Sequence, residues 1–122
     1  MPCAEFTHLD ESSSPQMVDV GSKEVTERRA VARTIIDVPD EVLTALGSSG
    51  IMHSSKGSIF DVAIIAGTQA AKKTAELIPL CHIIPLDSVK IDLHLDKDQR
   101  IIVECRVRAT HKTGVEMEAL VG

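Results

Sequence analysis

The fold is decided by residues 89–109, which read VKIDLHLDKDQRIIVECRVRA. In the first half of this stretch apolar residues alternate with charged ones. After the DKDQ turn at 96–99 the alternation resumes and continues to Ala109. Successive side chains of a strand point to opposite faces of a sheet, so a period of two places the apolar set on one face. The stretch therefore predicts an antiparallel hairpin, with strands at 89–95 and 101–109 and one dry face.

A long helix is predicted before the hairpin, at 59–77. Apolar residues recur there at spacings of three, four or seven, namely Ile59, Ala63, Ala66, Ala70 and Leu77. Pro79 ends the helix. The small residues between 66 and 71 predict a surface on which another element can pack closely.

The chain before this helix predicts a strand and a short helix. Residues 25–36 (VTERRAVARTII) suit a strand, although Ala and Arg also permit a helix; the two isoleucines and the following Pro39 favour the strand. Residues 40–47 read as a short helix with acidic residues in its first turn and Gly47 at its exit. Residues 48–57 read as a loop.

The C-terminal stretch predicts the start of another helix, because Thr113 and Glu116 have the spacing of a capping box. The order strand, helix, strand, strand, helix matches the first part of a βαββαβ unit. We therefore expect an α+β, ferredoxin-like fold whose C-terminal helix and strand are cut short, in a natural domain that continues beyond Gly122. Residues 17–122 are expected to form one domain, and the polar residues 1–16 a mobile N-terminal arm.

Composition argues against several classes of function. The formal charge of −5 does not suit a nucleic-acid partner, which needs a basic surface. Three cysteines without a close pair do not predict a disulfide framework, and no stretch reads as a secretory signal or reaches transmembrane length. We expect a cytoplasmic protein with neither a nucleic-acid nor a membrane partner. With two Phe and no Trp or Tyr, any recognition of a flat heterocycle would depend on edge hydrogen bonds and charged groups.

Three loops concentrate the functional groups, at 53–57, 79–85 and 110–118. The first two flank the long helix, and about 20 helical residues span about 30 Å, so these two loops cannot form one site in one subunit. Either they serve separate sites, or a neighbouring chain brings them together. The second alternative predicts a homo-oligomer with shared sites.

Each candidate residue in these loops has a functional and a structural interpretation. Lys56 precedes a helix N-terminus that favours phosphate, but these residues alone favour a solvated loop lysine. His82 could be a general acid or base, or a phosphate ligand, since its ordinary pKa is about 6.5. Cys81 could be a nucleophile or metal ligand, although a buried thiol beside a hydrogen-bonded histidine fits better. No histidine or cysteine spacing predicts a metal site.

Glu116 and Glu118 could bond the NH groups of a guanine-like base. They are two residues apart at a helix start, so they project in different directions. Capping and the helix dipole explain Glu116 without a ligand. Arg28 is a candidate phosphate ligand, although strand arginines are usually solvated.

Longer strings resemble the molybdenum cofactor biosynthesis protein C (MoaC) family. They are FTHLD at 6–10, MVDV at 17–20, TERRAVA at 26–32, KGSIFDVAIIAGTQAAKKT at 56–74, LIPLCH at 77–82 and KTGVEMEAL at 112–120. They occur in the same order and spacing as in that family. LIPLCH followed by KTGVEMEAL is the most specific combination.

The resemblance implies a cyclic pyranopterin monophosphate synthase, a lyase of molybdenum cofactor biosynthesis. Such an enzyme converts cyclised dihydro-GTP, supplied by a radical-SAM enzyme, to cyclic pyranopterin monophosphate and releases pyrophosphate, with no metal or organic cofactor. The family forms a hexamer, a trimer of dimers with sites at the dimer interface. Lys56 and His82 are implied to be catalytic. The implied substrate-binding residues are Leu80, Cys81, His82, Glu116, Met117, Glu118 and Arg28.

The sequence departs from the family pattern in two places. Ser58 stands where an aspartate usually follows the Lys-Gly pair. The catalytic aspartate and lysine of an Asp-Met-Cys-Lys motif, which the resemblance places after GVEMEAL, are not among these 122 residues. The chain is therefore read as the synthase given in part or, alternatively, as a non-catalytic homologue that binds substrate or oligomerises with a full-length copy. By themselves, the 122 residues are expected to bind a purine nucleotide weakly and not to turn it over.

Overall fold

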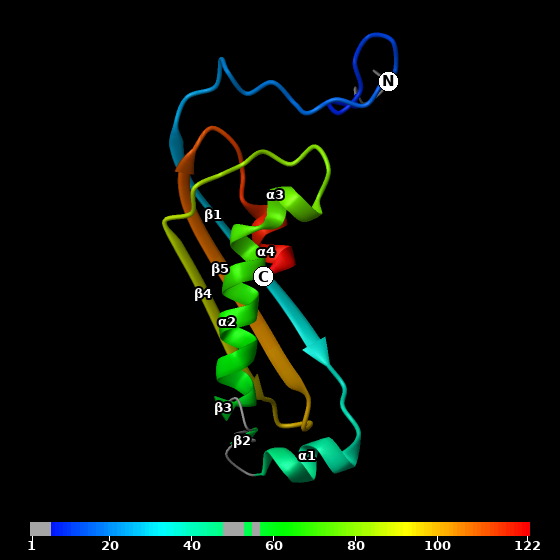
Figure 1. The fold of residues 1–122 in the computed structure, drawn as a ribbon, viewed down its shortest axis with the longest axis vertical. Coiled ribbons are helices and arrows are strands. Elements are labelled where there is room, and N and C mark those ends of the chain that lie inside the picture. Colours follow the sequence, from blue (N-terminus) through cyan, green and yellow to red (C-terminus); the bar gives the residue numbers. More distant parts are fainter. Residues whose placement is uncertain (1–5, 48–52, 55–56) are drawn as a thin grey trace.

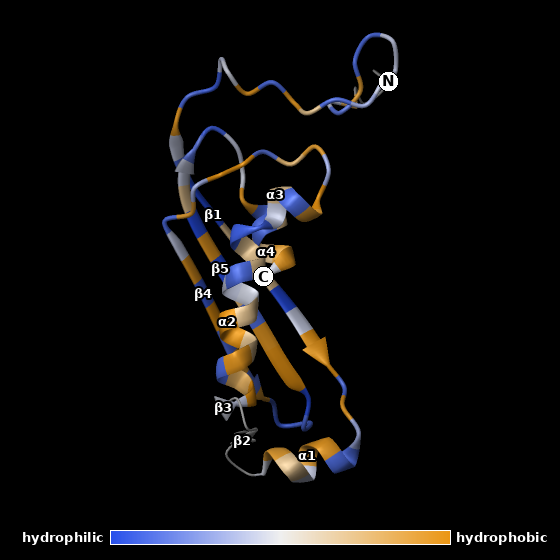
Figure 2. Cartoon of the chain, in the orientation of Figure 1, coloured by the Kyte–Doolittle hydropathy of each residue, from blue (hydrophilic) through white to orange (hydrophobic). Residues whose placement is uncertain are grey.

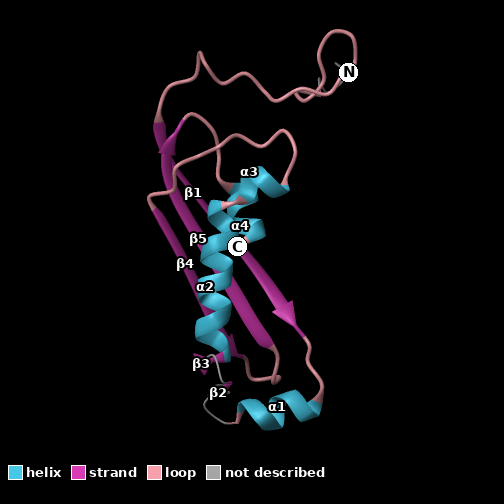
Figure 3. Ribbon diagram, in the orientation of Figure 1, coloured by secondary structure: helices cyan, strands magenta, loops and turns pink. Residues whose placement is uncertain are grey.

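The computed structural model describes residues 6–47, 53–54 and 57–122, in which strands and helices are joined by loops (Figure 3). The strands are β1 (Thr26–Ile36), β2 (His53–Ser54), β3 (Gly57–Ser58), β4 (Ser88–Leu95) and β5 (Ile101–His111). The helices are α1 (Asp40–Leu46), α2 (Ile59–Lys72), α3 (Thr74–Leu77) and α4 (Glu116–Val121).

The main sheet has three antiparallel strands in the order β1-β5-β4. The predicted hairpin is confirmed as β4 and β5, joined by a turn in which the Asp96 carboxylate accepts hydrogen bonds from the backbone N–H of Asp98 and Arg100, each at 2.9 Å. The predicted strand at 25–36 is confirmed as β1, which pairs along its whole length with β5. This strand order, with α2 and α4 on one face of the sheet, agrees with a ferredoxin-like α+β fold (Figure 1).

The alternation of side chains divides the sheet into two unlike faces. Cys105, Val107 and Ala109 of β5 are buried against the helices, whereas the intervening Arg106 and Arg108 are exposed on the other face. At the turn end of β5 the alternation fails, because both Ile101 and Ile102 are buried. The predicted dry face therefore holds from residue 103 onward.

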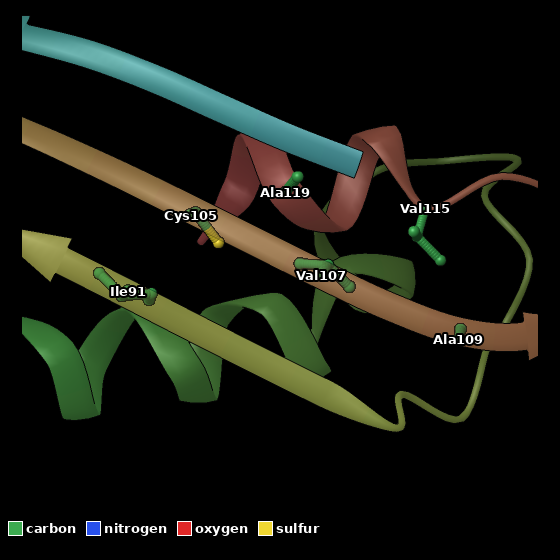
Figure 4. Close-up of a cluster of buried hydrophobic side chains, with 6 residues drawn as sticks. All are labelled: Ile91, Cys105, Val107, Ala109, Val115 and Ala119. Atoms are coloured by element: carbon green, nitrogen blue, oxygen red, sulfur yellow. The ribbon is translucent and has the colours of Figure 1, made fainter. Parts of the chain in front are cut away.

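The core lies between this face and the helices. Its buried members come from β4, β5 and the segment that contains α4, and are Ile91, Cys105, Val107, Ala109, Val115 and Ala119 (Figure 4). All are aliphatic or small, as a chain nearly without aromatic residues requires. Burial of such side chains is the main favourable contribution to folding.

The predicted long helix exists but is interrupted at Lys73. The amide N–H of Lys73 is shared between the carbonyls of Gln69 and Ala70, and Thr74 Oγ1 donates to the Ala71 carbonyl at 2.8 Å. A hydroxyl that bonds back to the preceding turn and a tightened last turn both end regular α-helix. The buried face also differs from the prediction: Ala71 and Thr74 are buried, whereas Leu77 is exposed.

The small-residue surface on α2 is confirmed at Gly67. A Cβ placed there would lie 2.5 Å from Ile91 Cδ1 and 2.6 Å from the Gly122 carbonyl oxygen, so no side chain fits without movement of its neighbours. The absence of a side chain at Gly67 lets the sheet and the end of α4 approach α2 together. This approach places α4 beside α2 over the sheet (Figure 1).

The segment between β1 and α2 contains the predicted short helix, α1, which exits at Gly47 with a φ of 67°. A left-handed φ of this kind suits glycine, which has no Cβ to clash. Within the segment predicted as a loop, β2 and β3 instead form a two-residue ladder, with His53 opposite Ser58. Lys56 lies outside the described residues.

Among the helices of the described residues, none combines the length and apolar character that crossing a membrane requires.

Candidate functional site

A cavity of about 500 Å³ lies at the end of the sheet where β4 begins and β5 ends. Its walls come from four stretches: residues 7–8, 18–23, 78–84 and 113–118. The third stretch is part of the largely apolar loop between α3 and β4 (Figure 2). Leu80, Cys81 and His82 from that loop and Glu116, Met117 and Glu118 from α4 all line the cavity. Six of the residues that the sequence predicted for substrate binding thus line the same cavity.

The loop that carries Leu80, Cys81 and His82 begins with a tight turn. The Cys81 amide donates to the Ile78 carbonyl at 3.4 Å, Pro79 occupies the second position, and Leu80 at the third has a φ of 65°. Proline at the second position and a positive φ at the third are features of a type II turn, in which glycine or asparagine is usual at the third. A leucine in the left-handed region is strained, and such strain persists where the surrounding structure holds it.

His82 is fixed by the N-terminal segment. Its Nε2 lies 2.6 Å from the carbonyl oxygen of Val18. A carbonyl oxygen only accepts, so Nε2 carries the proton in this contact and Nδ1 is the second nitrogen of the ring. Of the two neutral tautomers, the contact therefore requires the one with its proton on Nε2, and it holds Val18 at the cavity.

The entry to α4 differs from the predicted capping box. The helix begins at Glu116, with Val115 as its N-cap and no side-chain cap hydrogen bond. Val115 is buried in the core, and this burial sets the start of the helix later than the Thr113 spacing suggested. Thr113 lines the cavity instead of capping the helix.

Glu118 is the most unusual side chain of the site, since it is charged in water yet only 3 % exposed here. Its Oε1 lies 3.9 Å from Cys81 Sγ, and its buried Oε2 has no hydrogen-bond partner. Burial, with the nearby negative charge of Glu116 as a lesser cause, raises the pKa of Glu118. A buried oxygen without a hydrogen-bond partner destabilises the folded protein unless a bound ligand supplies the missing donor.

Cys81 is half-buried beside this carboxyl group and is a free thiol, as is the buried Cys105. Burial first, and the carboxylates of Glu118 and Glu116 next, raise the pKa of Cys81. A raised pKa keeps the thiol protonated, and the thiolate is the nucleophilic form. The environment of Cys81 favours a binding thiol over a nucleophile.

Arg28 is placed differently from the other predicted site residues. It does not belong to the residues that line the cavity. Its Nη2 lies 3.4 Å from the Lys112 carbonyl oxygen, and its buried Nε has no partner. Arg28 therefore supports the loop that leads into α4, and its role as a phosphate ligand stays a prediction.

Besides neighbours of the candidates in the 78–84 and 113–118 stretches, the candidate list missed a group of cavity residues, namely Thr7, His8, Val18, Val20 and Lys23. All belong to the N-terminal segment, part of which the sequence predicts to be a mobile arm. In the structure this part forms a turn, with Leu9 bridged to Pro15 and the Asp10 carboxylate accepting from the amides of Ser12 and Ser14. The signal that could have found them is their place in or near the FTHLD and MVDV strings.

Within the ranges that the structure describes, three or more His, Cys, Asp or Glu side chains nowhere gather closely enough to hold a metal ion. The cavity instead combines two carboxyl groups from α4 with His8, Lys23 and His82 on its other walls. Such a site can bind the NH edge of a base through the carboxyl groups of α4, and an anion through the side chains on its other walls.

Comparison with known proteins identifies the family of the chain. Cyclic pyranopterin monophosphate synthase of Xanthomonas oryzae pv. oryzae is 44 % identical over 119 residues, which are 98 % of this chain and 72 % of the relative. The enzyme of the same name from Pelotomaculum thermopropionicum is 47 % identical over 116 residues, 94 % of this chain and 66 % of the relative.

A molybdenum cofactor biosynthesis bifunctional protein of Synechocystis is 46 % identical over 121 residues, 96 % of this chain and 35 % of that protein. The family model for the MoaC family matches residues 17–122, which include nearly all of the strings that carried the resemblance. The chain belongs to the MoaC family.

Proposed function

We propose that this protein is a cyclic pyranopterin monophosphate synthase, a lyase that converts cyclised dihydro-GTP to cyclic pyranopterin monophosphate and pyrophosphate. The names of its relatives support the reaction. The observation that carries the proposal is the unpartnered Oε2 of Glu118 in the wall of a cavity that also presents His82 and Lys23. A guanine-derived base supplies NH donors for the carboxyl group, and the phosphates of the same substrate suit the Lys23 ammonium group and an N–H donor of His82.

Glu118 would recognise the base. Its Oε1 already faces Cys81, so Oε2 is the atom that a ligand NH can reach after a small movement. A site built to hydrogen-bond a polar substrate discriminates strongly against analogues that lack the group, because its own buried atoms are then left unpaired. Glu116, which is more exposed, would bond a second donor of the same base.

His82 would supply proton transfer or stabilise phosphate charge. Its Nε2–H is already bonded to Val18, so the proton that moves would be taken up or released at Nδ1. Lys56, a catalytic residue by resemblance, lies outside the described residues. Its neighbour Gly57 lies in β3 at one end of α2 (Figure 1), whereas residues 78–82, which line the cavity, follow the other end of α2 through α3.

This separation leads us to propose a homo-oligomer in which Lys56 of one subunit completes the site of another, within a hexamer of three dimers. Exposed apolar side chains around the cavity favour burial against a second subunit. Ile83 is 85 % exposed, Leu120 69 % and Leu77 61 %. Mixing Lys56→Ala with His82→Ala protein should restore some activity through hybrid sites, and absence of rescue after verified subunit exchange would count against sharing.

We place the enzyme in the cytoplasm, downstream of a radical-SAM enzyme that supplies the cyclised nucleotide. The proposed reaction, as the family resemblance implies it, uses no metal or organic cofactor.

Turnover of cyclised dihydro-GTP tests the proposed function. We would assay the 122-residue chain and a second version extended with a family member's C-terminal segment that carries the Asp-Met-Cys-Lys motif, and follow cyclic pyranopterin monophosphate by mass spectrometry. We expect product from the extended version and only weak substrate binding by the 122-residue chain. Glu118→Gln should weaken substrate binding, whereas Glu41→Gln, on the distant α1, should not. An extended version that folds but neither binds the substrate nor releases pyrophosphate would refute the assignment.

A further inference from the structure

The N-terminal segment at 18–23 crosses the cavity and is held at two points by the two loops that carry the predicted site. His82 Nε2 contacts the Val18 carbonyl oxygen at 2.6 Å, and Lys112 Nζ donates to the Gly21 carbonyl oxygen at 3.0 Å. His82 follows α3 and Lys112 precedes α4, so the segment joins elements that are distant in the sequence. Figure 1 shows the N-terminal chain running across the end of the molecule at which both loops lie.

The segment also folds on itself between these two anchors and just beyond them. The Asp19 carboxylate accepts a hydrogen bond from the Gly21 amide at 2.8 Å, and the Lys23 amide donates to the Val20 carbonyl at 3.1 Å. An aspartate that bonds the backbone two residues on makes an Asx turn, which fixes the local chain direction. Val18 and Val20 are half-buried in the cavity wall. The turn therefore determines where Lys23 lies.

Lys23 has a charge that the rest of the described wall does not duplicate. Among the described residues that line the cavity, Lys23 is the only lysine or arginine. The carboxylates in that wall, Glu116 and Glu118, both come from α4, so an anionic part of a ligand is repelled from α4 and attracted to Lys23. His8, which also lines the cavity, can add a second donor on the N-terminal side.

We infer that the N-terminal segment is a built wall of the site, in which Lys23 binds the phosphate groups of the ligand and Asp19 positions Lys23 through its turn. This inference rests on the proposed function for the location of the ligand, and adds to it the residues that bind its phosphates. Asp19 does not line the cavity, so its role is one of positioning. The ligand class is a phosphoanhydride anion of the pyrophosphate type.

Binding of inorganic pyrophosphate, measured by isothermal titration calorimetry, tests Lys23. Loss of one charge-assisted contact should weaken binding by Lys23→Ala about tenfold or more. Lys97→Ala is the matched control, because Lys97 lies in the turn at the opposite end of the sheet, and it should leave the affinity unchanged. Circular dichroism checks that the variants stay folded. Equal pyrophosphate affinities of wild type and Lys23→Ala, or no pyrophosphate binding by wild type, would overturn the inference.

A pair of substitutions at Asp19 tests positioning. Both Asp19→Ala and Asp19→Asn remove a negative charge near the cavity, which by itself should strengthen pyrophosphate binding. Only asparagine keeps an oxygen that can accept from the Gly21 amide. We expect the alanine variant to bind pyrophosphate more weakly than wild type and the asparagine variant to bind at least as tightly. Equal strengthening in both would overturn the positioning role.

Guanosine separates this inference from the proposed function. It lacks phosphates, so Lys23→Ala should not change its affinity, whereas Glu118→Gln should lower it. Pyrophosphate binding that depends on Lys23, together with no guanosine binding and no product, would leave the anion site standing and refute the proposed reaction.

Discussion

The packed core and the cavity end of this small protein differ in how well their residues follow local conformational and burial preferences. In the core, small and aliphatic residues such as Gly67 and Val107 fill the space between sheet and helices, and local sequence preference agrees with the structure. At the cavity, Leu80 adopts a left-handed backbone and Glu118 is buried with an unpartnered oxygen. Violations of local rules are expected at functional sites and are compensated elsewhere in the fold. Substitutions should therefore change stability in the first region and ligand chemistry in the second.

His82→Ala should give the largest effect and separate the two regions most clearly. Removal of a positioned acid–base or charge-stabilising group lowers the rate by about 10²- to 10⁴-fold. His82 is only partly buried, so the free energy of unfolding should change little by comparison. Turnover is measured in the extended version and stability by urea unfolding. Near wild-type turnover would remove His82 from the mechanism.

Gly67→Ala should have the opposite effect: it should lower stability and change turnover little. The added Cβ would approach Ile91 Cδ1 and the Gly122 carbonyl oxygen to about 2.5 Å, and overpacking of this kind costs about 1–3 kcal/mol. For a domain of this size, each kcal/mol lowers the melting temperature by about 4–8 °C. Ala66→Val, on the exposed side of the same helix, is the control and should have a much smaller effect. Equal melting temperatures of Gly67→Ala and wild type would show that the core relaxes around the methyl group.

Glu118→Gln and Asp96→Asn should change the pH dependence of stability with opposite signs. Burial raises the pKa of Glu118, so its stabilising contribution is complete below its unfolded pKa and is lost as the pH rises through its native pKa. Hydrogen bonds from Arg100 lower the pKa of Asp96, so its contribution is present above its unfolded pKa and is lost as the pH falls through its native pKa.

We therefore expect Glu118→Gln to be more stable than wild type at neutral pH, with a difference that shrinks toward pH 4. Asp96→Asn should be less stable than wild type at neutral pH, with a difference that shrinks in acid. Urea unfolding across the pH range measures both. Parallel profiles for the two variants would mean that the cavity carboxyl group is not destabilising.

Leu80→Gly should have the smallest effect on stability. At this position the glycine variant should be more stable than the alanine variant, which is the reverse of the order expected in a helix. Glycine relieves a left-handed strain of about 1–2 kcal/mol but adds unfolded-state entropy, so the net change should be within about 1 kcal/mol. Leu80→Ala keeps the strain and should be less stable than Leu80→Gly. At Leu77, in α3, alanine should instead be preferred over glycine. The same order at both positions would contradict the strained turn at Leu80.

The elements that could be predicted from the sequence are those defined by local patterns. The period of two in 89–109 identified the hairpin, because side-chain direction in a strand is a local property. Gly47 identified the exit of α1 for a similar reason. Through their resemblance to the MoaC family, the LIPLCH and KTGVEMEAL strings identified six of the cavity-lining residues.

Tertiary structure alone decided the features that depend on contacts distant in the chain. Burial of Val115 in the core moved the start of α4 past the expected capping box. The hydrogen bond from Thr74 to Ala71 accompanies the interruption of the long helix. The buried face of that helix includes Gly67, against which the sheet and the end of α4 pack closely. The wall at 18–23 also escaped prediction, because its anchors His82 and Lys112 are more than 60 residues away. A periodic pattern encodes which face of an element is apolar, but the partner that covers that face is a property of the folded chain.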